Sequence, residues 1–189
     1  SIAGGAMMYI SCVIQGVRFS FTLFAIMFLV TFSVYNLNRK TDEEEDSINH
    51  MDRFSFTKKY ENVLYYSALI AYFLSLLFAM SHGIKAVLIT SIPLICGLLY
   101  SCVWMPKEFK YRRLKEIPGV KNYVVAIAWA LTPTLLPAQF SSTASTGESL
   151  ASFVIGAYFF SLVFINSVIC DMRDIEGDAF SGVDTIPVI

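Results

Sequence analysis

The sequence predicts an all-α protein, a polytopic bundle of transmembrane helices, and three observations support this prediction. Hydrophobic residues make up 56% of the 189-residue chain and charged residues 15%, whereas soluble domains carry about 25% charged residues. The charges are bunched, so that long stretches of the chain carry none. Several of these stretches are long enough to cross a bilayer. We expect the lipid bilayer, and no nucleic acid, among the partners.

Six apolar segments follow one another along the chain. A spanning helix needs about 20 mostly apolar residues, and five segments approach or reach this length: 19–38, 63–81, 86–105, 120–140 and 149–170. A sixth segment, 2–16, has the composition of the later part of such a helix. We therefore expect one transmembrane domain over 1–189, incomplete at both ends. Pro93, Pro133 and Pro137 predict kinks, which neighbouring helices can tolerate.

The connectors between these segments alternate in charge. The connectors 36–62 and 106–119 and the region from 171 are long and charged, whereas 16–18, 82–85 and 141–148 are short or nearly uncharged. The first group and its flanks hold twelve of the fourteen Lys and Arg residues: Arg39, Lys40, Arg53, Lys58, Lys59, Lys107, Lys110, Arg112, Arg113, Lys115, Lys121 and Arg173. The positive-inside rule places this group on the cytoplasmic side. We thus expect a multi-pass protein of the cytoplasmic membrane with its Asp-rich segments facing the cytoplasm.

Two acidic clusters lie on this charged side, each directly after an apolar segment. Asn38, Asp42 and Asp46 are spaced i, i+4, i+8, and Asp171, Asp174 and Asp178 are spaced i, i+3, i+7. Either spacing places the side chains along one face of a helix. Carboxylates stacked in this way repel one another unless a cation neutralises them, and hard oxygen ligands suit Mg²⁺. The alternative is a solvated helix end, which we favour for Glu43, Glu44 and Glu45.

The charged connector between the clusters offers hydrogen-bond donors. Tyr111 and Lys115 are four residues apart, one turn of a helix, and a phenol and an ammonium can both donate to diphosphate oxygens. The alternative interpretation is that the basic residues of this connector face lipid headgroups.

Taken together, these motifs resemble those of the UbiA superfamily of intramembrane prenyltransferases. The family's NxxxDxxxD motif is matched by Asn38, Asp42 and Asp46, and its DxxDxxxD motif by Asp171, Asp174 and Asp178. Its YxxxK motif is matched by Tyr111 and Lys115. The resemblance covers essentially the whole chain and implies a UbiA-like bundle of nine helices around a cavity, of which about six are present. The chain departs from the family at Met51, where relatives have proline, and at Asp184, where a basic residue is frequent.

The resemblance implies Mg²⁺-dependent transfer of a prenyl group from a polyprenyl diphosphate to a lipophilic acceptor. The implied metal ligands are Asn38, Asp42, Asp46, Asp174 and Asp178. Tyr111 and Lys115 would bind the diphosphate and act catalytically with Asp174, and Asn38, Arg53 and Arg173 would also contact substrate. Asp171 would orient or deprotonate the acceptor, and Asn166 would hydrogen-bond to it or to another helix. Aromatic rings that could steady an allylic cation are those of Tyr35, Tyr100, Trp129, Tyr158 and Phe159.

Two other functions remain open from the residues alone. A cation-binding transporter would carry acidic residues in its membrane segments, but here the acids lie almost entirely on one side. Another membrane transferase, acting on phosphorylated lipids, would also need an Asp-rich site. The acceptor and the length of the prenyl chain are not predicted.

Overall fold

The computed structural model contains helices and no strands among the residues that it describes. These are residues 1–41, 47, 51–103, 106, 108, 111–117, 119–141 and 146–175, with the side chains of 52, 53 and 146–149 excluded. The α-helices are α1 (Ile2–Ile14), α2 (Phe21–Thr41), α4 (Met51–Lys59), α5 (Glu61–Met80), α6 (Ile84–Ser101), α7 (Val120–Leu135) and α8 (Thr146–Arg173). Two short 3₁₀ helices are η1 (Leu114–Glu116) and η2 (Pro137–Gln139). The predicted all-α class is confirmed.

Each predicted apolar segment corresponds to one helix. Four helices in the described part of the chain are long and apolar enough to span a membrane, namely α2, α5, α6 and the part of α8 from Leu150 to Arg173. The helices α1 and α7 are shorter, with 13 and 16 residues. The short helix α4 was not predicted, because its sequence lies within a charged connector.

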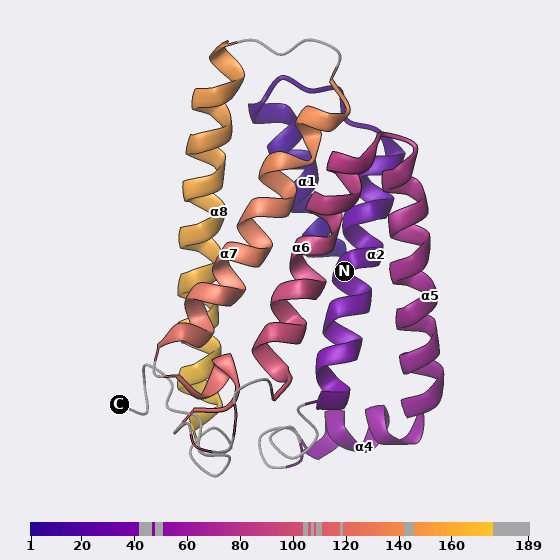
Figure 1. The fold of residues 1–189 in the computed structure, drawn as a ribbon, viewed down its shortest axis with the longest axis vertical. Helices are drawn as coiled ribbons and strands as arrows, with labels where there is room; N and C mark the ends of the chain where they lie inside the picture. Colours follow the sequence, from indigo (N-terminus) through magenta and orange to yellow (C-terminus); the bar gives the residue numbers. More distant parts are fainter. Residues whose placement is uncertain are drawn as a thin grey trace.

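The helices other than α4 run side by side, and α4 lies across the lower end of the bundle in Figure 1. Helix α2 packs against α1, α5 and α6, whereas α7 packs against α6, α8 and α1. Because successive helices alternate in direction, the end of α2, the helix α4, the 3₁₀ helix η1 and the end of α8 all lie at the lower end in Figure 1. At the opposite end α5 and α6 are joined by a tight turn, where Gly83 takes a φ of +94° that side chains other than hydrogen rarely allow.

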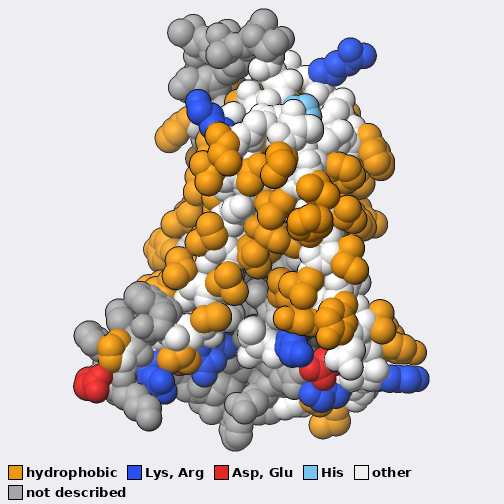
Figure 2. Space-filling view, turned by 45° about the vertical axis from the view of Figure 1, so that its right-hand side comes forward, with side chains coloured by type: hydrophobic (Ala, Val, Ile, Leu, Met, Phe, Trp, Pro, Cys, Tyr) orange, Lys and Arg blue, Asp and Glu red, His pale blue; other side chains and the backbone are white. Residues whose placement is uncertain are grey.

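The core is formed where α1 and α2 meet. Met8, Cys12, Ile26 and Val30 are fully buried there, and the absence of a side chain at Gly4 lets α1 approach Thr31 closely. Outside this core the long helices carry hydrophobic side chains on the surface, which cover the middle of the face shown in Figure 2. Charged side chains gather mainly at the lower end of that face. This distribution fits a bundle surrounded by lipid.

Two prolines inside the bundle leave backbone carbonyls without their helical donors, and hydroxyl groups from other helices replace those donors. Pro93 lacks the N–H that would bond to the carbonyl of Ile89, and that carbonyl accepts a hydrogen bond from Thr132 Oγ1 on α7 at 3.4 Å. Pro137 likewise has no N–H to donate to the carbonyl of Pro133. That carbonyl accepts a 2.6 Å hydrogen bond from Ser11 Oγ on α1. Neighbouring helices thus compensate for these prolines.

We expect Ser11→Ala to lower the thermal unfolding midpoint in detergent by roughly 3–6 °C. The substitution removes a buried donor and leaves the Pro133 carbonyl unpaired, a cost of about 1–2 kcal/mol. Ser161→Ala is the matched control, since Ser161 is exposed and donates only to a carbonyl of its own helix, that of Ala157. Equal midpoints for the two variants would contradict this explanation of how Pro137 is tolerated.

Candidate functional site

The predicted site residues fall into two groups in the structure. Asn38, Tyr111, Lys115, Asn166, Asp171, Arg173 and Asp174 lie in the described part of the chain. Asp42, Asp46 and Asp178 lie outside the described residues, and Arg53 lies in α4 without a described side chain. All the described site residues except Asn166 lie at or near the charged end of the bundle, at the end of α2, in the α6–α7 connector and at the end of α8.

Asn38 is near the end of α2 and points toward α6. A Cβ atom added at Gly97 would lie 3.5 Å from Asn38 Oδ1, so the absence of a side chain at residue 97 leaves room around the amide oxygen. Asn38 also lines a small cavity of about 30 Å³ together with Tyr100 of α6 and Trp129 of α7. The amide therefore faces the interior of the bundle, where α2, α6 and α7 meet.

Three of the predicted aromatic residues lie at or beside this cavity. Tyr100 and Trp129 line it directly, and the ring of Tyr35 stacks on that of Trp129 with 5.6 Å between the centroids. Tyr158 is instead exposed on α8, and Phe159 is buried in a separate cluster with Ala130 and Ile155. A second, larger cavity of about 350 Å³ touches Asn38 from the side of α5 and is lined mainly by apolar side chains.

The connector that carries Tyr111 and Lys115 is not the α-helical turn that the spacing suggested. Glu116 accepts hydrogen bonds from the backbone N–H groups of Arg112 and Arg113 at 2.6 and 3.2 Å, and its other oxygen is 3.0 Å from Arg113 Nε. These contacts fold the segment into the 3₁₀ turn η1. Lys115 is only 2% exposed in this turn, and Tyr111 is half-buried.

Charge and hydrogen bonding also act on Glu116 itself. Partial burial raises the pKa of its carboxyl, but the two donated backbone hydrogen bonds and the Arg113 guanidinium outweigh burial and hold the pKa below its ordinary value. The ionised form is therefore the one that holds the turn. Its contribution to stability is complete above the unfolded pKa and is lost as pH falls through the lower folded pKa.

We expect Glu116→Gln to increase the rate of trypsin cleavage after Arg112 and Arg113 by roughly fivefold at pH 8. The neutral amide cannot replace the contacts that the ionised carboxylate makes. The free energy of opening the turn therefore falls by about 1 kcal/mol. Glu61→Gln serves as the control, because Glu61 pairs with Lys40 and Lys58 at a different connector. If both variants are cleaved at the wild-type rate, Glu116 does not hold this turn.

The last turn of α8 places Asp171 and Asp174 in different surroundings. Asp171 is 2% exposed, and its two oxygens lie 2.9 Å from Lys121 Nζ and 2.7 Å from Asn122 Nδ2. Helix α8 ends at Arg173, so Asp174 directly follows the helix, whereas Asp178 lies outside the described residues. Asp174 is half-buried and its Oδ1 lies 3.2 Å from the Nε atom of the exposed Arg173. Asp174 is therefore the more accessible carboxylate.

Asn166 lies farther from the end of α8 and is exposed on the helix surface. Its hydrogen bond to an acceptor stays a prediction. By contrast, Ser167 beside it accepts a hydrogen bond from Asn122 Nδ2 at 3.1 Å.

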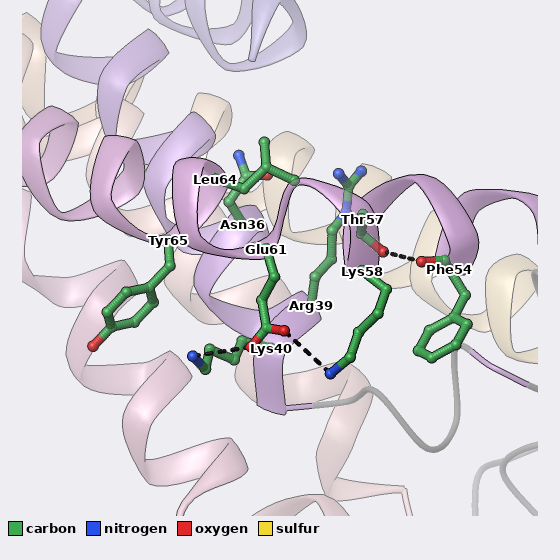
Figure 3. Close-up of a pocket in the computed structure, with 9 residues that line it drawn as sticks. All are labelled: Asn36, Arg39, Lys40, Phe54, Thr57, Lys58, Glu61, Leu64 and Tyr65. Carbon is green, nitrogen blue, oxygen red and sulfur yellow. Dashed lines mark hydrogen bonds and ion pairs between the residues drawn. The ribbon is translucent and has the colours of Figure 1, made fainter.

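A group of charges holds the junction of α2, α4 and α5, and Figure 3 shows it in close-up. Glu61 at the start of α5 lies 3.1 Å from Lys40 Nζ of α2 and 3.1 Å from Lys58 Nζ of α4. The Lys40 ammonium also lies 4.5 Å from the ring centroid of Tyr65, a cation–π contact. Glu61 thus connects the helices on both sides of the segment that carries Asp42 and Asp46.

Helix α7 links the parts of the site that the structure describes. It contacts α2 through the stacking of Trp129 on Tyr35 and α8 through Lys121 and Asn122. Within the described residues, no group of three His, Cys, Asp or Glu side chains is placed to hold a metal ion. Of the metal ligands predicted from the sequence, Asn38 and Asp174 are the ones that lie among the described residues.

Sequence reasoning missed Lys121 and Asn122 as site residues. Lys121 was counted only among the basic connectors, although it is paired with a buried carboxylate. Asn122 offered a usable signal, because a buried amide in an otherwise apolar membrane helix needs a partner on another helix. It is fully buried in α7.

Comparison with known proteins identifies the family. The chain matches the UbiA prenyltransferase family over residues 1–189. Neither the curated proteins nor the solved structures gave a match. Since its described residues include four helices long and apolar enough to span a membrane, the chain is an integral membrane protein. Since the match covers the whole sequence, the chain belongs to the UbiA prenyltransferase family.

Proposed function

We propose that the protein transfers a prenyl group from a polyprenyl diphosphate to a lipophilic acceptor in the membrane, with Mg²⁺ as cofactor. Family membership over residues 1–189 is the observation that carries this proposal. Asn38, Tyr111, Lys115 and Asp174 all belong to the charged end of the bundle, and Asn38 also lines an interior cavity. Polar donors and oxygen ligands beside an apolar interior suit a substrate with a charged head and an isoprenoid tail.

The donor set fits Mg²⁺. The oxygen of Asn38 has open space toward Gly97, and Asp174 offers a half-buried carboxylate, and both are the hard ligands that this ion prefers. Together with Asp42, Asp46 and Asp178, which lie outside the described residues, they would hold the metal. When bound, Mg²⁺ supplies neutralisation of the negative charge that develops on the leaving diphosphate.

The protein's own cations and donors act on the same leaving group. Lys115, buried in η1, would place its ammonium against diphosphate oxygens, and Tyr111 would donate through its hydroxyl. Arg173 and Arg53 would add guanidinium donors. As the bond between the allylic carbon and oxygen breaks, Tyr100 and Trp129, which line the same cavity as Asn38, would stabilise the developing cation through their ring faces.

We also propose that this end of the bundle faces the cytoplasm. Twelve of fourteen Lys and Arg residues belong to its connectors and their flanks, which is the asymmetry that the positive-inside rule describes. Labelling of single cysteines introduced at Lys58 and Lys85 in intact cells, with a reagent that cannot cross the membrane, tests the orientation: only the variant at Lys85 should react.

Release of inorganic diphosphate tests the proposed reaction. Purified protein in lipid nanodiscs, supplied with Mg²⁺, farnesyl or geranylgeranyl diphosphate and a panel of lipophilic acceptors, should release diphosphate in an acceptor-dependent manner. A transporter would instead move Mg²⁺ into proteoliposomes without releasing diphosphate, and a transferase of phosphorylated lipids would consume a lipid phosphodiester. Either of those outcomes, without prenylated product, overturns the proposal.

A further inference from the structure

We propose that Lys121 and Asn122 are positioning residues, which hold Asp171 as a buried anchor so that the end of α8 presents Asp174 to the site. The catalytic consequence rests on the prenyltransferase activity proposed above, whereas the anchor itself does not. In this arrangement Asp171 contacts neither substrate nor metal.

Each oxygen of the Asp171 carboxylate has a partner on α7. Lys121 Nζ is 2.9 Å from Oδ1, and Asn122 Nδ2 donates to Oδ2 at 2.7 Å. The side chains of Asp171 and Lys121 are 3% and 15% exposed, and Asn122 is fully buried. A carboxylate with a partner on each oxygen and almost no exposed surface is shielded from an acceptor molecule by its surroundings.

The orientation of the Asn122 amide follows from this contact. Its Nδ2 group donates to both Asp171 and Ser167, whereas its Oδ1 atom is buried without a partner in the described residues. Turning the amide over would place its oxygen against the carboxylate and lose both donated bonds. In this orientation Asn122 makes both hydrogen bonds to α8, and its own carbonyl oxygen has no partner among the described residues.

The anchor is directly connected to Asp174. The N–H of Asp174 donates to the carbonyls of Asp171 and Cys170, at 3.1 Å in each case, and α8 ends between them at Arg173. Fixing the Asp171 side chain to α7 therefore fixes the turn from which Asp174 projects. Without the anchor this turn is free to fray, as helix ends do when their contacts are lost.

A pair of single variants and their combination test the anchor. Lys121→Met and Asp171→Asn each leave one buried polar or charged group without its partner, and each should lower the unfolding midpoint by roughly 6–20 °C. The double variant replaces the ion pair with an uncharged pair, in which the introduced amide can still bond to Asn122, and should recover most of the midpoint. Additive losses in the double variant would overturn the pairing. Lys85→Met, at an exposed lysine on the opposite end, is the matched control.

Activity separates positioning from catalysis and from a purely structural role. At a temperature well below every midpoint, Lys121→Met should raise the Mg²⁺ concentration for half-maximal diphosphate release at least fivefold, and the double variant should return it to within twofold of wild type. An unchanged Mg²⁺ response in Lys121→Met would overturn the positioning role. A double variant that folds but stays at least 100-fold slower would identify Asp171 as an acid or base instead.

Failure of the proposed reaction would look different from failure of this inference. If wild-type protein releases no diphosphate, the reaction is wrong, and the midpoints of the four proteins still decide whether Asp171 is anchored by α7. If wild type is active and the midpoints are additive, only the anchor is wrong.

Discussion

Asp174→Ala should lower the rate of diphosphate release by at least 100-fold. Asp174 is the more accessible of the two described carboxylates at the end of α8, since Asp171 is buried and paired. Its removal takes away a ligand for Mg²⁺ where negative charge develops on the leaving group, and losses of this kind cost about 10²–10³ in rate. Steady-state release, measured at saturating donor and increasing Mg²⁺, gives the size of the effect.

The control for this prediction is Glu108→Ala, which removes an exposed carboxylate from the α6–α7 connector. It should leave the rate within twofold of wild type. Asp174→Asn keeps an oxygen ligand without the charge, and its rate should lie between those of Asp174→Ala and Glu108→Ala. A rate for Asp174→Ala close to that of Glu108→Ala would mean that Asp174 takes no part in the reaction.

Lys115→Met should lower kcat/KM for the prenyl diphosphate by about 10- to 100-fold. Lys115 is 2% exposed, so little water would compete with a bound diphosphate for its ammonium, and hydrogen bonds between charged groups contribute about 1.5–3 kcal/mol. Methionine fills a similar volume without the charge. Because the diphosphate is charged both before and during cleavage, much of the loss should appear as a higher KM for the donor.

Lys59→Met is the control for Lys115→Met, since Lys59 is exposed at the end of α4 and lies over the ring of Tyr60. Lys115→Arg should recover part of the activity, limited by the larger guanidinium in a buried turn. If the donor KM is the same for Lys115→Met and wild type, Lys115 does not bind the diphosphate.

The helices were predictable because the length of each apolar segment can be read from the sequence alone. Segment 63–81 became α5 and segment 149–170 became most of α8, since a stretch of about 20 apolar residues has few alternatives to a helix in a membrane. The gathering of charged connectors at one end followed from the alternation of helix direction. These inferences needed no knowledge of contacts between helices.

The local form of the site depended on contacts that spacing does not reveal. The helical spacing of Tyr111 and Lys115 gave a turn of the wrong type, because the Glu116 carboxylate competes for the backbone N–H groups of Arg112 and Arg113. The role predicted for Asp171 was assigned without knowledge of Lys121, which the packing of α7 on α8 places against its carboxylate. Side chains that pair across helices are decided by tertiary structure.

The bond from Ser11 to the carbonyl of Pro133 has a consequence for biogenesis. Its two partners are separated by 122 positions along the chain, so α7 enters the bilayer long after α1 has been synthesised. Until the two helices meet, that carbonyl faces hydrocarbon without a donor. Helix α1 must therefore stay near the insertion site while the chain between α1 and α7 is made, which couples the stable insertion of α7 to the retention of α1.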